Sequence, residues 1–116
     1  MRFMSFITTD NTDPMTPELI EAMNKLANRE VQTGRMLDGG KLAPIESGAR
    51  VTVADGKLSV IDGPMVEAKE VIGGYVIMEF QSKEEAIASG VEFLQLHKDF
   101  MPGWEGMCEI RALEDH

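Results

Sequence analysis

One stretch of this chain, residues 74–80, is apolar at nearly every position, and this limits the folds that the chain can adopt. In a strand, Tyr75 and Ile77 would point to one face and Val76 and Met78 to the other. A strand with one face in water alternates apolar and polar residues, which this one does not. We therefore expect residues 74–80 to form a central strand whose two faces are both covered.

The rest of the chain alternates strand-like and helix-like segments. Thr16 followed by Pro17 is a typical helix start, because the hydroxyl caps a free backbone amide and proline suits the first helical position. Ser82 and Glu85 form a capping box that starts a second helix. Asp55-Gly56 between two alternating segments is typical of a β-hairpin, because its tight turn needs positive φ. Strands are thus predicted at residues 3–8, 36–42, 50–54, 57–61, 74–80 and 107–113, and helices at 17–33 and 83–97.

Two strand–helix–strand halves joined through a hairpin predict an α+β fold. This would be a ferredoxin-like sandwich with an inserted β-hairpin and with both helices on one face of the sheet. The first strand is also two-faced, since Phe3 and Ile7 point opposite to Met4 and Phe6. Two helices on one face of the sheet cannot cover its other face. A second copy that packs sheet against sheet would cover that other face, so we expect a homodimer in the form of a dimeric α+β barrel. The alternative is a monomer with an irregularly apolar edge.

The size and charge of the chain restrict the number of domains and the kinds of partner that we expect. A chain of 116 residues is long enough for one core but too short for two, so residues 1–116 are predicted to form a single domain. The net charge is −9, with eleven Lys and Arg scattered among twenty Asp and Glu. A binder of phosphate backbone needs a basic stripe, so nucleic acid is not expected as a partner.

The single cysteine, Cys108, cannot form an internal disulfide, which argues against a secreted, disulfide-stapled fold. It lies in an alternating apolar stretch and is interpreted as a buried structural thiol. The first residues lack the apolar segment and cleavage site of a signal peptide. No apolar run approaches the roughly 20 residues of a spanning helix. We therefore expect a cytoplasmic protein with no membrane partner.

Residues 61–75 combine turn formers, charges and a pair of glycines. Gly63 and Pro64 stop a strand after Asp62, because glycine permits unusual φ and proline lacks a backbone donor. Gly73-Gly74 lets the backbone approach another segment closely at the start of the next strand. Taken alone, these features are also compatible with a hairpin exit, a solvated charged loop and a bend into the sheet.

The motifs of this stretch resemble those of the YCII-related family, in the branch known for an Asp-Gly-Pro-Phe motif. They are Asp62-Gly63-Pro64-Met65, Glu67-Ala68-Lys69-Glu70 and Gly73-Gly74-Tyr75, with Gly39-Gly40-Lys41-Leu42 upstream and Glu109-Ile110-Arg111 in the last strand. The resemblance spans nearly the whole chain and departs at Met65, where the family usually has phenylalanine. It implies a dimeric ferredoxin-like α+β barrel, in agreement with the two-faced strands.

The resemblance implies less about chemistry. Some YCII-like proteins are similar to small lyases or dehydrochlorinases that use a His–Asp pair, in which the carboxylate fixes the imidazole tautomer and stabilises its charged form. Those enzymes carry their histidine near the start of the chain, where this sequence has none. Members with this motif are also often encoded beside, or fused to, extracytoplasmic-function sigma factors, which implies a possible regulatory link.

Without that histidine, the candidate catalytic residues are Asp62, Glu70 and His97. A cation at His97 would interact favourably with the end of the second helix, which is a structural alternative to a role in a site. No set of three or four side chains has the spacing of a metal site, and no glycine-rich phosphate loop precedes a helix. Neither a metal nor a cofactor is therefore expected. The candidate ligand-binding residues are Asp62, Glu67, Lys69, Tyr75 and Arg111.

Two functions follow as hypotheses. The first is a homodimeric small-molecule-binding or regulatory module, with a cavity near the sheet–sheet interface bordered by residues 62–75. The second is a cofactor-free lyase or isomerase that uses a carboxylate such as Asp62 or Glu70 as an acid–base group. A perturbed carboxylate facing a closed cavity would favour the enzyme, whereas an exposed carboxylate without a cavity would count against it.

Overall fold

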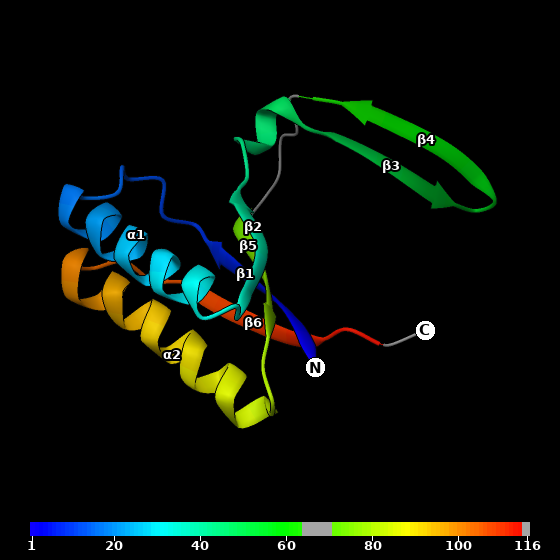
Figure 1. The fold of residues 1–116 in the computed structure, drawn as a ribbon. Helices are drawn as coiled ribbons and strands as arrows, with labels where there is room; N and C mark the ends of the chain where they lie inside the picture. The colour runs from blue at the N-terminus through cyan, green and yellow to red at the C-terminus, as the bar shows by residue number, and fades with distance from the viewer. Residues whose placement is uncertain (64–70, 115–116) are drawn as a thin grey trace.

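The chain folds into a four-stranded antiparallel sheet with two helices on one face and a separate β-hairpin (Figure 1). The structure is a computed structural model and describes residues 1–63 and 71–114. The predicted order of elements is confirmed, with small shifts at their ends. The elements are β1 (Arg2–Thr9), α1 (Pro17–Gln32), β2 (Met36–Lys41), the short 3₁₀ helix η1 (Ile45–Ser47), β3 (Ala49–Ala54), β4 (Lys57–Asp62), β5 (Val71–Glu79), α2 (Lys83–Phe100) and β6 (Met107–Ala112).

Both helices begin at the residues that the sequence indicates. The Thr16 hydroxyl accepts a hydrogen bond from the Leu19 amide at 3.2 Å, and Pro17 is the first residue of α1. The Ser82 hydroxyl accepts one from the Glu85 amide at 3.1 Å. Neither α1 nor α2 is long and apolar enough to cross a membrane, nor is any other helix among the described residues.

The strand order of the large sheet is β2-β5-β1-β6, and every neighbouring pair is antiparallel. This is the ferredoxin-like arrangement that two strand–helix–strand halves predict. Strand β5 lies between β2 and β1, so the central position expected for residues 74–80 is confirmed. Strand β1 holds the other central position and pairs with both β5 and β6.

The hydrophobic core lies between the helices and one face of this sheet. Gly90 of α2 sits directly over β6: a Cβ placed there would lie 3.0 Å from Ile110 Cδ1 and 3.5 Å from Cys108 Sγ. The glycine lowers helix propensity but lets α2 approach the sheet closely. The core residues are Phe3, Met78, Phe80 and Ala86, with Met36, Val76 and Ile110 packed against them.

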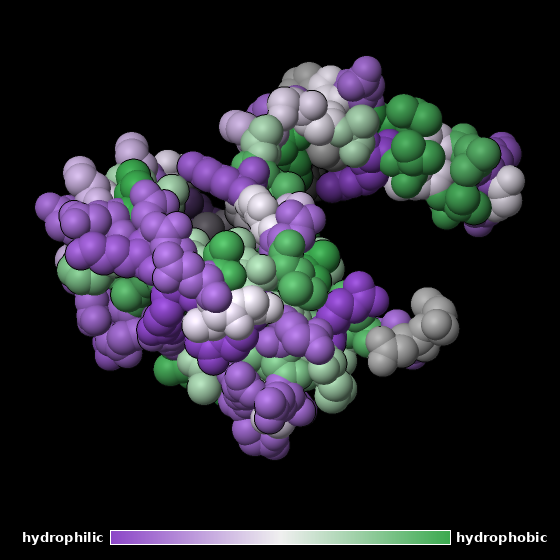
Figure 2. All heavy atoms as spheres, in the orientation of Figure 1, coloured by the Kyte–Doolittle hydropathy of each residue, from purple (hydrophilic) through white to green (hydrophobic). Residues whose placement is uncertain are grey.

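Strands β3 and β4 pair only with each other and form a two-stranded sheet, which we call the hairpin arm. Asp55 and Gly56 have φ values of 53° and 72°, so the predicted tight turn with two positive φ angles is confirmed. The arm projects away from the rest of the molecule on the side opposite the helices (Figure 1). Figure 2 shows an open hollow between the arm and the body, and apolar side chains along the arm surface.

Candidate functional site: the open face of the sheet

The helices cover one face of the four-stranded sheet, and the other face, which we call the open face, is the candidate site. Phe3 and Met78 are buried in the core beneath the helices. Side chains alternate along a strand, so the neighbouring Met4 and Ile77 point to the open face. Within the described residues, neither a helix nor a strand covers this face.

Two rows of side chains cross the open face because the register places their residues opposite one another. Each row has an apolar centre from β1 and β5 and a charged residue from β6. Directly opposite side chains in antiparallel strands lie about 5 Å apart, so each row is a continuous surface. The rows are Arg111, Met4, Ile77 and Asp38, and Glu109, Phe6, Tyr75 and Gly40.

Glycines allow strands β2 and β5 to meet closely at one end of these rows. A Cβ on Gly40 would lie 3.6 Å from Cε1 of Tyr75, so the tyrosine ring lies beside this glycine. A Cβ on Gly74 would lie 3.1 Å from the Gly40 carbonyl oxygen. The expectation that Gly74 permits a close backbone approach is confirmed. Gly40 therefore places no side chain of its own against the Tyr75 ring.

Glu109 and Arg111 carry opposite charges on the β6 side of the open face. Glu109 is partly buried, whereas Arg111 is exposed. Among the ion pairs of the described residues, none joins these two side chains. Both groups can therefore contact a molecule lying on the face.

Asp62 is exposed and ends strand β4, where it lies opposite Ala49 at the base of the hairpin arm. The following glycine is required by close packing. The Gly63 amide donates to the Gly48 carbonyl at 2.9 Å. A Cβ on Gly63 would lie 2.4 Å from the Glu46 carbonyl oxygen, closer than any side chain allows.

His97 is buried in an aromatic cluster near the end of α2. Its ring lies 4.5 Å from the Trp104 ring and 4.9 Å from the Phe93 ring. Burial lowers the pKa of His97, although a hydrogen bond between its Nδ1 and the Phe93 carbonyl at 3.0 Å acts in the opposite direction. Its surroundings thus favour a neutral imidazole, so packing explains His97 better than a cation at the helix end.

The predicted site residues do not converge on one place. Tyr75 and Arg111 share the open face, Asp62 lies on the hairpin arm, and His97 packs against α2 and the loop that carries Trp104. The other predicted site residues, Glu67, Lys69 and Glu70, lie outside the described residues. No group of three or more His, Cys, Asp or Glu within residues 1–63 and 71–114 could hold a metal ion.

The sequence of the first 91 residues matches a known protein family. A family model described as the YCII-related domain matches residues 1–91, well over half of the chain. The chain belongs to the YCII-related domain family. No curated protein matches it significantly.

The YCII-related match covers only part of the candidate site. It includes the β1 and β5 residues of the open face and ends inside α2. It does not reach His97, Glu109 or Arg111. The charged side of the open face therefore comes from a strand beyond the matched region, although β6 completes the same sheet.

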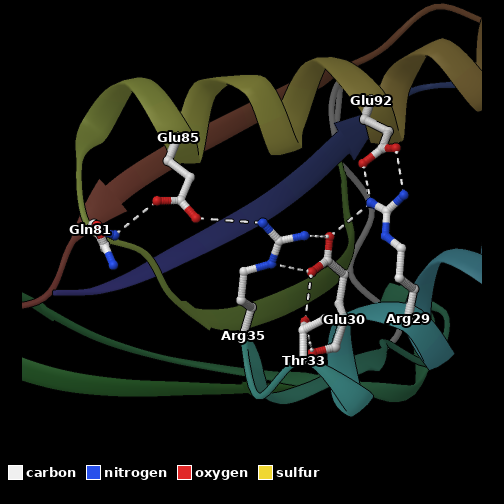
Figure 3. A network of polar contacts seen from close by, with 7 residues as sticks. All are labelled: Arg29, Glu30, Thr33, Arg35, Gln81, Glu85 and Glu92. Atoms are coloured by element: carbon white, nitrogen blue, oxygen red, sulfur yellow. Dashed lines mark hydrogen bonds and ion pairs between the residues drawn. The ribbon is translucent and has the colours of Figure 1, made fainter.

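A buried ion cluster between the helices of this YCII-related chain was not predicted (Figure 3). Glu30 is 4% exposed and accepts hydrogen bonds from Arg29 at 3.0 Å and from Arg35 at 2.6 and 2.8 Å. Arg29 also binds Glu92 of α2, and Arg35 approaches Glu85 at 3.5 Å. The contacts with Glu85 and Glu92 cannot be read from the sequence, because they form only when α2 folds against the segment that carries Arg29 and Arg35.

The cluster is structural in character. Burial by itself raises the pKa of Glu30, but the hydrogen bonds from Arg29 and Arg35 outweigh it, and the pKa is lowered overall. Glu30 therefore stays ionised and paired. Cys108 of β6 is half-buried beneath α2. Burial raises the pKa of its thiol, in keeping with the predicted structural role.

Proposed function

We propose that this chain is a homodimeric module that binds a small molecule between the open faces of two sheets. The observation that carries the proposal is the open face itself. It has an apolar centre of Met4, Phe6, Tyr75 and Ile77, all only partly exposed in one copy, and charged residues border this centre. Two such faces packed together would bury the apolar centre.

The composition of the open face is that of a ligand site. Small-molecule sites are mostly apolar and carry a few polar groups that fix orientation. The Tyr75 hydroxyl, Glu109 and Arg111 would supply these groups. An apolar small molecule with an acidic group that Arg111 could bind would suit this lining.

The described residues give the enzyme hypothesis less support. Asp62 is exposed and does not face a closed cavity, which is the outcome that counts against an acid–base role. His97 is packed among aromatic rings away from the open face. We therefore prefer binding to catalysis for this site. The proposal also includes two points from the resemblance. The chain belongs to the branch with the Asp-Gly-Pro-Phe motif, and it is linked to an extracytoplasmic-function sigma factor.

A substitution that introduces an acidic residue on the open face tests the dimer. Phe6→Asp would place a charge at the centre of the sheet–sheet contact and weaken the dimer by about 100-fold. Val91→Asp on the helix surface is the control, because Val91 is 61% exposed and lies outside the proposed contact. Light scattering should give a dimer for the wild type and the control and a monomer for the variant. A wild-type monomer at micromolar concentration would overturn the proposal.

Ligand binding can be tested on the purified dimer by native mass spectrometry. We expect the dimer to retain a small molecule, seen as extra mass that is lost on denaturation. Arg111→Gln should reduce the amount of retained small molecule by about tenfold, because a charged hydrogen bond contributes about 1.5–3 kcal/mol. Lys25→Gln, at an exposed site on α1, is the control. Loss of retained mass in both variants, or in neither, would contradict a site at Arg111.

A further inference from the structure

The hairpin arm exposes an apolar face that no described residue of one copy covers. Val51 lies opposite Val60, and Val53 lies opposite Leu58, so the four side chains share one face. They are between 66% and 76% exposed. Isolated surface hydrophobic residues are common, but four adjacent ones mark an interaction site.

The opposite face of the arm is mostly polar, although Ile61 lies opposite Arg50 near its base and Ala54 lies opposite Lys57 near its turn. Thr52 and Ser59 lie opposite one another and are joined by a hydrogen bond between their hydroxyls. Arg50 and Lys57 point to this same side, because they alternate with the valines and the leucine. The arm is therefore built to be covered on one side and to face water on the other.

The arm also extends the molecule beyond the size of a compact domain. A compact chain of this length has a radius of gyration of about 13 Å, whereas the observed value is 16.1 Å. Each arm strand has six residues and so reaches about 20 Å from its base. A two-stranded hairpin alone in water is marginally stable at best. A stable hairpin arm therefore requires a surface that packs against it.

A second copy of the chain is the occupant that fits best. The chain has two uncovered apolar surfaces, the arm face and the open sheet face, and the arm projects on the open side of the sheet (Figures 1 and 2). A two-fold contact brings the same two surfaces from each copy together and can cover all of them at once. An unrelated partner would have to match both surfaces separately.

We propose that the hairpin arm of each copy packs its face of Val51, Val53, Leu58 and Val60 on the second copy and closes the rim of the space between the two open sheets. This inference rests on the proposed homodimer and deepens it, because the partner then contributes aliphatic side chains to each ligand site. The ligand would be enclosed by the β1 and β5 side chains of both copies and by the arms. Asp62, at the base of the arm, would lie near the rim.

Paired substitutions on the two faces of the arm test this contact. Val53→Glu with Leu58→Glu places two acids on the apolar face. The control, Thr52→Glu with Ser59→Glu, adds the same charge at the adjacent cross-strand pair on the polar face. We expect the first double variant to weaken the dimer by at least about tenfold, and the control to change it by less than about threefold. Equal effects of the two would overturn the inference.

Cross-linking locates the arm directly and does not depend on how well a charged variant folds. In a Cys108→Ser background, Val53→Cys or Thr52→Cys is labelled with benzophenone maleimide and irradiated. A denaturing gel should show a species at twice the 12.8 kDa chain mass for the label at position 53 and little at position 52. A dimeric wild type without this species would refute the arm contact and leave the proposed function intact. A monomeric wild type would refute both.

Discussion

At the scale of single residues, His97 shows how burial changes the role that a sequence indicates. A histidine in the last turn of a helix is typical of a cation that interacts with the helix dipole. Here the ring packs between Phe93 and Trp104 and its pKa is lowered, so the neutral form is favoured. Position along a helix could be predicted from the sequence, but the aromatic neighbour from the following loop could not.

His97 should make folding stability depend on pH. The unfolded chain has a histidine pKa of about 6.5, and the folded pKa is lower. The unfolded state therefore binds more protons as the pH falls below about 6.5, and stability decreases until the folded pKa is passed. We expect His97→Gln to reduce the slope of unfolding free energy against pH between about 7.5 and 5.5, as measured by urea unfolding.

His116→Gln is the control for this experiment, since it removes the other histidine of the chain. Its slope should equal that of the wild type. An unchanged slope in His97→Gln would mean that the pKa of His97 is not lowered by folding. A general loss of stability with the same slope would indicate only a packing defect.

At the scale of elements, the ends of helices and the hairpin turn could be predicted because they depend on local chemistry. Thr16, Ser82 and the Asp55-Gly56 turn all act on backbone groups within a few residues. The separation of the hairpin from the main sheet could not be predicted. Alternation along a strand indicates which side chains share a face, but it does not indicate which sheet the strand joins. The ion cluster was missed because Glu85 and Glu92 lie 50 and 63 residues from the arginines that they contact.

The ion cluster should contribute strongly to the docking of α1 on α2. Removing Arg35 leaves the buried carboxylate of Glu30 with fewer donors. Breaking a buried ion pair from one side costs about 3–5 kcal/mol, and we expect Arg35→Leu to cost about 3 kcal/mol, because Arg35 is partly exposed. Chemical denaturation checks this value.

An exposed ion pair supplies the matched comparison. Lys25 and Glu21 are one turn apart on α1, 3.5 Å from each other, and both are more than 70% exposed. Lys25→Leu should change stability by less than about 0.5 kcal/mol, because exposed pairs contribute little. Comparable losses in the two variants would show that burial of Glu30 does not strengthen the cluster.

At the scale of the whole molecule, the two strand–helix–strand halves predicted the ferredoxin-like fold, and the two-faced strands left the second face of the sheet to be explained. The structure places helices on one face only, as expected. The candidate catalytic residues could not be placed from the sequence, because Asp62 lies on the hairpin arm and His97 packs between Phe93 of α2 and Trp104 of the following loop. Tyr75 and Arg111 could be placed together, because strand alternation and sheet order determine both positions.

Net charge should influence the proposed dimer. Each copy carries −9, so two copies repel one another at long range. Salt screens this repulsion, since the Debye length falls from about 14 Å at 50 mM to about 4 Å at 500 mM. We expect the dimer to become roughly two- to tenfold tighter over this range in sedimentation equilibrium. A dimer that weakens with salt would indicate that ion pairs, rather than apolar contact, hold it together.

The position of β1 has a consequence for synthesis of the chain. This strand is made before both of its neighbours, β5 and β6, and α1, β2 and the hairpin arm are made in between. On the ribosome, β1 therefore has both backbone edges unpaired until β5 and β6 have emerged. Unpaired apolar strands readily join other chains. A newly made copy is thus vulnerable to aggregation throughout this interval, and chaperones that shield β1 would matter until β6 emerges.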